Sequence, residues 1–268
     1  MTVGFVSLVG AGLGDADLLT VKAVRRLQAA DLVLYDALVG PTIIALAPHA
    51  QRFCVGKRAG VKSVNQGTIE RLMVRSARQG KRVVRLKCGD PFVLGRGGEE
   101  ALALQRAGIP FEVVPGVTSA VAAPGLAGIP VTQRGMASGF VVVSGHAESA
   151  CGPILDAVTP HSLTVIVLMG LARRNAVATR LINHGWRRNT PAAIVLAAGS
   201  PSMRTWHGRL DELGSAGIDT ADGAPGTIVV GDVVGLRSVL ANAGSTPLTA
   251  AAMAGGSSRR WRSTRIEA

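Results

Sequence analysis

The chain alternates short apolar runs with segments in which apolar residues recur every three or four positions. The runs predict buried strands, and the recurring spacing predicts helices that pack one face against a sheet. In the first half, predicted strands cover residues 5–9, 32–35, 52–55, 83–86 and 111–114. Predicted helices lie between or after them, at residues 18–27, 41–47, 65–79 and 98–107, with a helix of small residues from about 119. The first helix is predicted to bury an apolar stripe of Leu18, Val21, Val24 and Leu27, and the third to be capped by Asn65 with Ile69, Leu72 and Met73 facing inward. This alternation is typical of an α/β fold with a parallel sheet.

The second half of the chain has further apolar runs with fewer helical patterns between them. Runs at residues 140–144, 164–169, 192–197 and 227–230 predict a second, mixed sheet, to which residues 205–208 add an antiparallel strand. Helical patterns cover about 175–184 and 209–214. Gly125, Gly128 and Pro130 interrupt the pattern between the halves. We therefore predict two α/β domains, residues 1–115 and 116–242, with a ligand cleft between them.

The last residues, 243–268, consist mostly of Ala, Gly, Ser, Thr and Arg. They have no periodic apolar face that could pack on a core. We predict a disordered basic tail there.

Glycine-rich loops follow two of the predicted strands. Residues 83–86 run into Gly89, Gly95, Gly97 and Gly98, and glycine permits backbone turns that other residues avoid. Glu99 and Glu100 then suit the first turn of a helix. Because strand ends gather at one edge of a parallel sheet, the loops after Val9, Tyr35, Val55 and Leu86 are predicted to face a common crevice, where open α/β sheets bind ligands.

A second glycine turn, Gly10-Ala-Gly-Leu-Gly14, follows the first strand, and an acid stands about 20 residues further on. That order is typical of dinucleotide-binding Rossmann folds. The spacing here is G-x-G-x-G rather than G-x-G-x-x-G, and the richer glycine loop comes two strands later. The sequence therefore disfavours a nicotinamide or flavin enzyme.

Composition predicts an acidic partner. The chain has 29 Lys and Arg against 17 Asp and Glu, a net charge of +12. Nucleic acid, anionic lipid and a polycarboxylate small molecule would each suit this charge. Aromatic residues make up only 3% of the chain, which disfavours a surface that stacks single-stranded nucleic acid.

The cysteines and the apolar runs bear on the compartment. Cys54, Cys88 and Cys151 are odd in number and far apart, which indicates reduced thiols rather than a disulfide frame or a zinc site. We expect no metal. The first residues carry no basic segment, and no apolar run approaches the roughly 18 residues needed to span a bilayer. We expect a cytoplasmic protein without a membrane partner.

Six ordered motifs carry a resemblance to a known family, at residues 9–15, 35–39, 55–60, 85–100, 114–120 and 128–132. Together they resemble the uroporphyrinogen-III C-methyltransferases of the tetrapyrrole methylase superfamily. Residues 165–170 and 228–237 extend the match to roughly residues 3–240. The resemblance implies S-adenosylmethionine as methyl donor, a homodimer, and methylation of uroporphyrinogen III through precorrin-1 to precorrin-2 for sirohaem or cobalamin synthesis. A substrate with eight carboxylates suits a basic cleft.

The resemblance also implies roles for single residues. Positions that line the methyl-donor site in the family are occupied by Leu13, Cys88, Gly89, Asp90, Val93, Thr118, Ser119, Met169 and Gly199. Asp36 and Lys57 match the family's proton acceptor and proton donor. Arg85, Arg96 and Arg134 are candidates for binding the acetate and propionate groups of the substrate, because a guanidinium can engage a carboxylate through two hydrogen bonds.

Three positions depart from the family pattern. Leu13, Cys88 and Gln133 stand where the family usually has Pro, Gly and His. Cys88 places a side chain in the tight donor loop, where glycine allows close approach of a ligand or a positive φ. Either the loop tolerates this side chain, or the chain is a methylase of another tetrapyrrole intermediate or a paralogue with weakened donor binding. A non-catalytic basic protein that binds nucleic acid is an alternative of another class, and it lacks a recognised nucleic-acid module.

Overall fold

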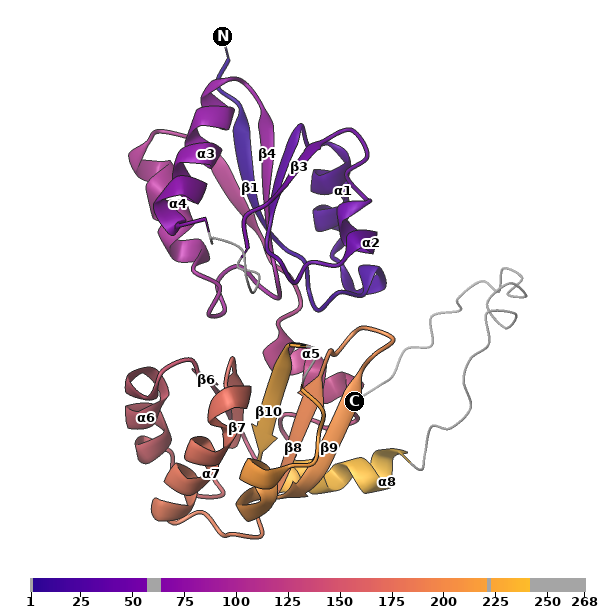
Figure 1. Ribbon diagram of the computed structural model, residues 1–268, viewed down its shortest axis with the longest axis vertical. Helices are drawn as coiled ribbons and strands as arrows, with labels where there is room; N and C mark the ends of the chain where they lie inside the picture. Colours follow the sequence, from indigo (N-terminus) through magenta and orange to yellow (C-terminus); the bar gives the residue numbers. More distant parts are fainter. Residues whose placement is uncertain (1, 57–63, 221–222, 242–268) are drawn as a thin grey trace, which may run out of the picture.

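The computed structural model describes residues 2–56, 64–220 and 223–241. Two five-stranded sheets, each covered by helices, make up the structure (Figure 1). The predicted α/β fold with two sheets is therefore confirmed. Lys57 and the predicted tail, residues 243–268, lie outside the described residues. The domain boundaries given above stay predictions.

The first sheet is wholly parallel and has the strand order β3-β2-β4-β1-β5. Its strands are β1 (Phe5–Gly10), β2 (Leu32–Tyr35), β3 (Gln51–Cys54), β4 (Arg82–Lys87) and β5 (Phe111–Val114). Its helices are η1 (Ala16–Leu18), α1 (Val21–Gln28), α2 (Pro41–Ile44), α3 (Gln66–Arg78) and α4 (Gly97–Arg106). All five parallel strands point their carboxyl ends toward one edge, as the sequence predicted.

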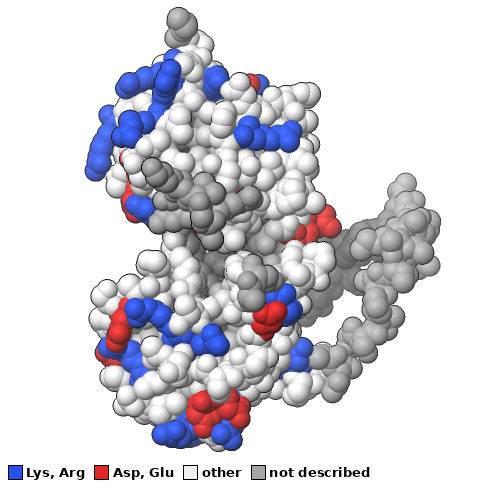
Figure 2. All heavy atoms as spheres, viewed as in Figure 1, with Lys and Arg blue, Asp and Glu red and all other residues white. Residues whose placement is uncertain are grey.

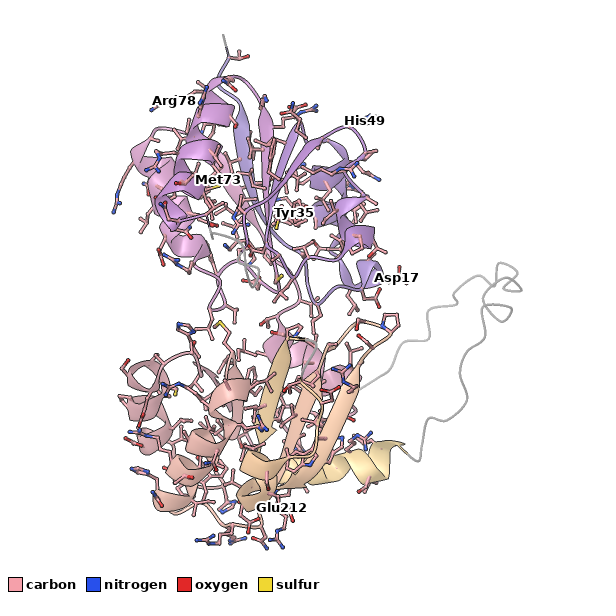
Figure 3. The ribbon with its side chains drawn as sticks, viewed as in Figure 1. Asp17, Tyr35, His49, Met73, Arg78 and Glu212 are labelled. Carbon is pink, nitrogen blue, oxygen red and sulfur yellow. The ribbon has the colours of Figure 1, made fainter. Side chains whose placement is uncertain are left out.

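Alternation along the strands decides which side chains face which helices. On β4, Val84 and Leu86 pack on the side of α1 and α2, together with Tyr35. Val83 packs on the opposite side, with Met73 of α3. Figure 3 labels Tyr35 and Met73, one from each of these two cores. By the same alternation Arg85 and Lys87 face the side of α3 and α4.

The predicted helix at residues 18–27 is two separate helices. The Asp15 carboxylate accepts from the Asp17 amide and begins η1, whereas the Thr20 hydroxyl accepts from the Ala23 amide and begins α1. Because α1 starts anew at Val21, its buried face consists of Ala23 and Leu27, and the predicted position of Val21 on that face is wrong.

The predicted inward face of α3 also needs one correction. Asn65 caps this helix as predicted, and Ile69 and Met73 are buried one turn apart. Leu72, which was predicted to face inward with them, is exposed. Its position, one residue before Met73, turns it about 100° away from the buried stripe.

The second sheet is mixed, with the strand order β6-β7-β10-β8-β9. Its strands are β6 (Phe140–Ser144), β7 (Thr164–Leu168), β8 (Pro191–Leu196), β9 (Arg204–Arg209) and β10 (Gly226–Val230). Among neighbouring strands of this sheet, only the pair β6–β7 is parallel. Strand β9 is the added antiparallel strand that the sequence predicted. Helical elements are α5 (Ser119–Leu126), α6 (Glu148–Ala157), η2 (Leu171–Arg173), α7 (Arg174–Asn183), η3 (Leu210–Ser215), η4 (Asp232–Leu236) and α8 (Arg237–Ala241).

Helices cover both faces of the second sheet. On one face α6, α7 and η3 bury Leu155, Leu181 and Leu213. On the other face α5 and η4 bury Ala123 and Val233. The sequence did not predict α6, because Gly152 and Pro153 lie inside it and both are usual helix breakers.

Three glycines let the backbone segments after β1, β4 and β5 meet. A Cβ built on Gly10 would lie 2.6 Å from the carbonyl oxygen of Gly89 and 2.6 Å from the Cα of Gly116. The loops are also bonded to each other, since the Gly89 amide donates to the Gly12 carbonyl at 2.8 Å and the Gly12 amide donates back at 3.2 Å. At Gly10 and Gly116 no side chain larger than a hydrogen fits between these segments, and Gly89 has a φ of +64°, so the three glycines fix how the strand ends converge.

This convergence predicts a large effect of one methyl group. We expect Gly116→Ala to lower the free energy of unfolding by about 2–3 kcal/mol or more, because its Cβ would meet the backbone of Gly89 and Gly10. Gly125→Ala is the matched control. Gly125 lies in α5 with nothing near its Cβ position, so alanine there should stabilise by about 0.5–1 kcal/mol. Urea unfolding measures both, and equal stability of the two variants would contradict the close approach.

Candidate active site

A cavity of about 560 Å³ lies where the strand ends of the two sheets meet. The first sheet contributes the loops after β1, β2 and β4. The second sheet contributes the residues after β7 and the end of β8, together with the beginning of β10. Because β10 is antiparallel to β7 and β8, its first residues lie at the same edge as their last residues. Figure 2 shows the molecule narrowed between an upper and a lower part.

Most of the residues singled out from the sequence line this cavity. They are Leu13, Asp36, Cys88, Gly89, Asp90, Val93, Arg96, Thr118, Ser119 and Met169. Gly199 does not line the cavity but adjoins Leu13, which does. The φ of Gly199 is +78°, and a Cβ on this residue would lie 3.1 Å from the Leu13 Cβ. The structure therefore brings together residues that are up to 156 positions apart in the sequence, from Leu13 to Met169.

Two of the predicted arginines do not line the cavity. Arg134 is exposed in the turn that the Gln133–Ala137 bridge closes. Arg85 is buried inside the first sheet. Only Arg96 of the three reaches the cavity wall, where its guanidinium pairs with Glu99 at 2.7 Å and keeps more than half of its side chain exposed.

Left-handed backbone conformations concentrate at the cavity. Among the described residues, five other than glycine have positive φ, and Leu94, Arg96 and Met169 of these line the cavity while Ala197 adjoins it. Such conformations are costly for residues with a Cβ and occur where the surrounding structure enforces them, often at ligand sites. The wall is therefore held in a shape that local preference alone would not give.

Asp90 holds two of the cavity loops together. Its carboxylate accepts from the Phe92 amide at 2.8 Å and from the Gly116 amide at 3.1 Å. Thr118 stabilises the start of α5, because its hydroxyl accepts a hydrogen bond from the Ala120 amide. Both side chains therefore stabilise the backbone around the cavity through hydrogen bonds from main-chain amides.

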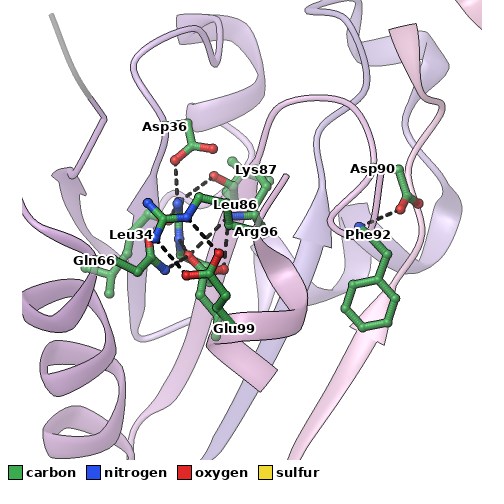
Figure 4. A network of polar contacts seen from close by, with 11 residues as sticks. Leu34, Asp36, Gln66, Leu86, Lys87, Asp90, Phe92, Arg96 and Glu99 are labelled. Atoms are coloured by element: carbon green, nitrogen blue, oxygen red, sulfur yellow. Dashed lines mark hydrogen bonds and ion pairs between the residues drawn. The ribbon is translucent and has the colours of Figure 1, made fainter. Parts of the chain in front are cut away.

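Arg85 binds Asp36 rather than facing the cavity. The guanidinium donates to an Asp36 carboxylate oxygen at 2.5 Å, to the Glu100 carboxylate at 2.9 Å, and to the carbonyls of Leu34 and Leu86 (Figure 4). Its side chain is 3% exposed. With all of these groups engaged, Arg85 has no free face for substrate carboxylates, and the structure does not support that predicted role. It instead orients Asp36, whose carboxylate lies on the cavity wall.

Sequence reasoning missed Lys87 and Glu100 as functional candidates. The Glu100 carboxylate, fully buried, accepts from Arg85, from the Lys87 ammonium at 3.1 Å and from the Gln66 amide at 3.1 Å. We call Asp36, Arg85, Lys87 and Glu100 the charge cluster. Burial lowers the pKa of Lys87, and the nearby Arg85 lowers it further, against the attraction of Glu100.

The strand alternation could have found the charge cluster. Val83, Arg85 and Lys87 share one face of β4, so two cations had to be buried against α3 and α4. Buried cations require anions, and Glu100 is one of the acids predicted in the first turn of the helix that covers that face. The cavity residues contributed by β8 and β10, such as Val195 and Thr227, had no such signal.

Cys88 fits its position without backbone strain. It is not among the described residues with a positive φ, and its side chain packs against the core under α1 and α2 while also reaching the cavity. The loop therefore tolerates the side chain. Burial raises the pKa of the thiol from 9.0 to about 12, and the Asp36 carboxylate raises it as well.

With this geometry established, comparison with known proteins gives the class. The family model of the tetrapyrrole (corrin/porphyrin) methylases matches residues 6–214, and the chain belongs to that family. Among curated relatives, siroheme synthase of Zymomonas mobilis is 45% identical over 241 residues, and siroheme synthase of Neisseria meningitidis is 48% identical over 240 residues. These matches cover 88% and 89% of this chain. The chain spans about half the length of these curated relatives, 50% in both cases.

Solved structures agree over nearly their whole length. Uroporphyrin-III C-methyltransferase from Thermus thermophilus is 42% identical, with a TM-score of 0.76, and the match covers 88% of this chain and 98% of that one. The same enzyme complexed with S-adenosylhomocysteine is 43% identical with a TM-score of 0.74, over 87% of this chain and 100% of that one. A cobalt precorrin-4 methyltransferase, 29% identical, also has a TM-score of 0.74 and covers 86% of this chain and 95% of that one.

No group of three or more His, Cys, Asp or Glu side chains within residues 2–56, 64–220 and 223–241 is placed to hold a metal ion. In the same residues no helix has the length and apolar character needed to cross a membrane.

The raised pKa of Cys88 predicts slow alkylation. A rise from 9.0 to about 12 reduces the thiolate fraction near pH 8 by about a thousandfold, whereas Cys54 is exposed. We expect iodoacetamide at pH 8 to modify Cys54 in the native protein and to leave Cys88 unmodified until urea unfolds the chain. Peptide mass spectrometry over time measures both sites. Equal alkylation rates of Cys54 and Cys88 in the native protein would contradict the raised pKa of Cys88.

Proposed function

We propose that this chain transfers methyl groups from S-adenosylmethionine to carbon atoms of uroporphyrinogen III, through precorrin-1 to precorrin-2. The observation that carries the proposal is the cavity, in which motif residues from both sheets surround a carboxylate, Asp36, held by a buried arginine. The similarity to a solved uroporphyrin-III methyltransferase over 98% of that enzyme's length supports the same conclusion.

The cavity suits the methyl donor. Its volume of about 560 Å³ lies in the range of small-molecule sites, roughly 300–1,000 Å³. Leu13, Val93 and Met169 give apolar walls for an adenine, and the Gly89 turn and the start of α5 present backbone and hydroxyl groups for the amino-acid end. A bound sulfonium donor supplies an electrophilic methyl group. A related enzyme crystallised with S-adenosylhomocysteine supports this assignment.

Asp36 is proposed as the proton acceptor. When a pyrrole carbon forms a bond to the methyl group, the sulfonium sulfur takes the electron pair of the broken bond, and the ring must lose a proton. The Asp36 carboxylate lies on the cavity wall with 28% of its side chain exposed, so it can reach a ligand while Arg85 fixes its direction. Lys57 remains the proposed donor by resemblance alone.

The remaining parts of the proposal concern the partners. Arg96 on the cavity wall could exchange Glu99 for a substrate carboxylate, in keeping with a chain of net charge +12. Arg134 remains a candidate by resemblance only. A homodimer, a cytoplasmic location and the absence of nucleic acid and membrane from the reaction also belong to the proposal, and the resemblance and composition support them.

The direct test incubates the protein with methyl-labelled S-adenosylmethionine and uroporphyrinogen III under anaerobic reducing conditions. Label in precorrin-2 is the expected result. A parallel incubation offers later methylated tetrapyrrole intermediates as acceptors, because a precorrin-4 methyltransferase is 29% identical to this chain. Label in one of these intermediates, with none transferred to uroporphyrinogen III, would favour the alternative of a related methylase. Transfer to neither, by a folded protein that binds the donor, would exclude the proposal.

Asp36→Asn should separate catalysis from donor binding. We expect kcat to fall about a hundredfold or more, while the affinity for S-adenosylhomocysteine stays within about twofold, because the amide keeps the shape but accepts no proton. Asp31→Asn is the control. Asp31 pairs with Arg82 at 2.9 Å at the other end of the same two strands. Turnover by Asp36→Asn at the wild-type rate would contradict the role of Asp36 as proton acceptor.

A further inference from the structure

Glu100 is the centre of the charge cluster although it does not line the cavity. Its carboxylate has no exposed surface and meets both cations, Arg85 at 2.9 Å and Lys87 at 3.0 Å. Gln66 of α3 donates a third contact at 3.1 Å. Arg85 spans from this buried carboxylate to Asp36 at the cavity, since its Nε donates to Glu100 and its Nη2 donates to Asp36.

The charges of the cluster balance, with two cations and two carboxylates. Removing the charge of Glu100 would leave Asp36 as the sole carboxylate against Arg85 and Lys87 in a buried setting. Burial and Arg85 already lower the pKa of Lys87, so Lys87 would release its proton more readily, but the Arg85 guanidinium cannot. In either case Asp36 becomes the only charged partner of Arg85, and the Asp36 carboxylate no longer experiences the repulsion of the Glu100 carboxylate.

We infer that Glu100, together with Lys87, is a positioning residue for Asp36, because it anchors Arg85 and takes up part of the guanidinium charge. This inference rests on the proposed function. Because Arg85 is shared between two carboxylates, it orients Asp36 while part of its charge is taken up by Glu100. Among the described residues, the Lys87 ammonium and the Cys88 thiol, on β4 and in the loop after it, also interact with Asp36.

Glu100→Gln tests the inference, since the amide keeps the shape and removes the charge. We expect kcat to fall about tenfold or more, the acid limb of the pH–rate profile to move to lower pH, and the KM for S-adenosylmethionine to stay within about twofold. The sign follows from the loss of a negative charge near Asp36, which favours its carboxylate form. Glu100→Asp, which keeps the charge, should restore part of the rate.

Glu112→Gln is the matched control. Glu112 also binds two cations, Lys22 and Arg26, and accepts from Ser7, but it lies on β5 away from the cavity. Arg26 holds the pKa of Glu112 down at about 2, so its loss should cost stability at neutral pH. We expect its pH–rate profile to match that of the wild type.

Two double variants distinguish positioning from a purely structural role. Combining Glu100→Gln with Lys87→Met removes one charge of each sign and should recover stability but not turnover, since Arg85 still faces Asp36 alone. In an Asp36→Asn background, Glu100→Gln should have little further effect on kcat. Turnover that recovers together with stability, or full additivity with Asp36→Asn, would overturn the inference. A wild-type protein without methyl transfer would instead refute the proposed function itself.

Discussion

Close backbone contact at Gly10, Gly89 and Gly116 is the constraint on which the site depends. These residues follow or end three neighbouring parallel strands. No Cβ fits at Gly10 or Gly116, and Gly89 has a φ of +64°, which favours glycine. The contact draws the loops after β1, β4 and β5 into one surface, which the Asp90 carboxylate then bonds together through the Gly116 amide. The cavity wall is thus set by main-chain geometry, and side chains from the second sheet complete it.

The charge cluster adds a second constraint behind that wall. Four ionisable groups share a region in which three of them are almost completely buried. Removing charges from water is costly, and such a cluster is stable only when each group is paired. The charge cluster therefore adds less to the free energy of unfolding than its many contacts suggest. Its more specific effect is to hold the Asp36 carboxylate in a defined position.

How much could be predicted from the sequence varies with the physical origin of each feature. Short apolar runs predicted both sheets, and the parallel arrangement correctly predicted that loops after Val9, Tyr35 and Leu86 converge, whereas most of the loop after Val55 lies outside the described residues. The environment of Arg85 was missed because a motif says nothing of which way a side chain points, whereas its strand position does. The helix α6 was missed because packing of Cys151 and Leu155 overrides the helix-breaking tendency of Gly152 and Pro153.

The neutral thiol of Cys88 bears on how such a pocket could remain intact over many reaction cycles. A sulfonium methyl donor is an alkylating agent, and a thiolate is among the most effective nucleophiles that a protein can offer it. With its pKa at about 12, Cys88 offers almost none. In the proposed reaction, a cysteine on this wall would therefore not compete as a methyl acceptor, because its thiol stays protonated.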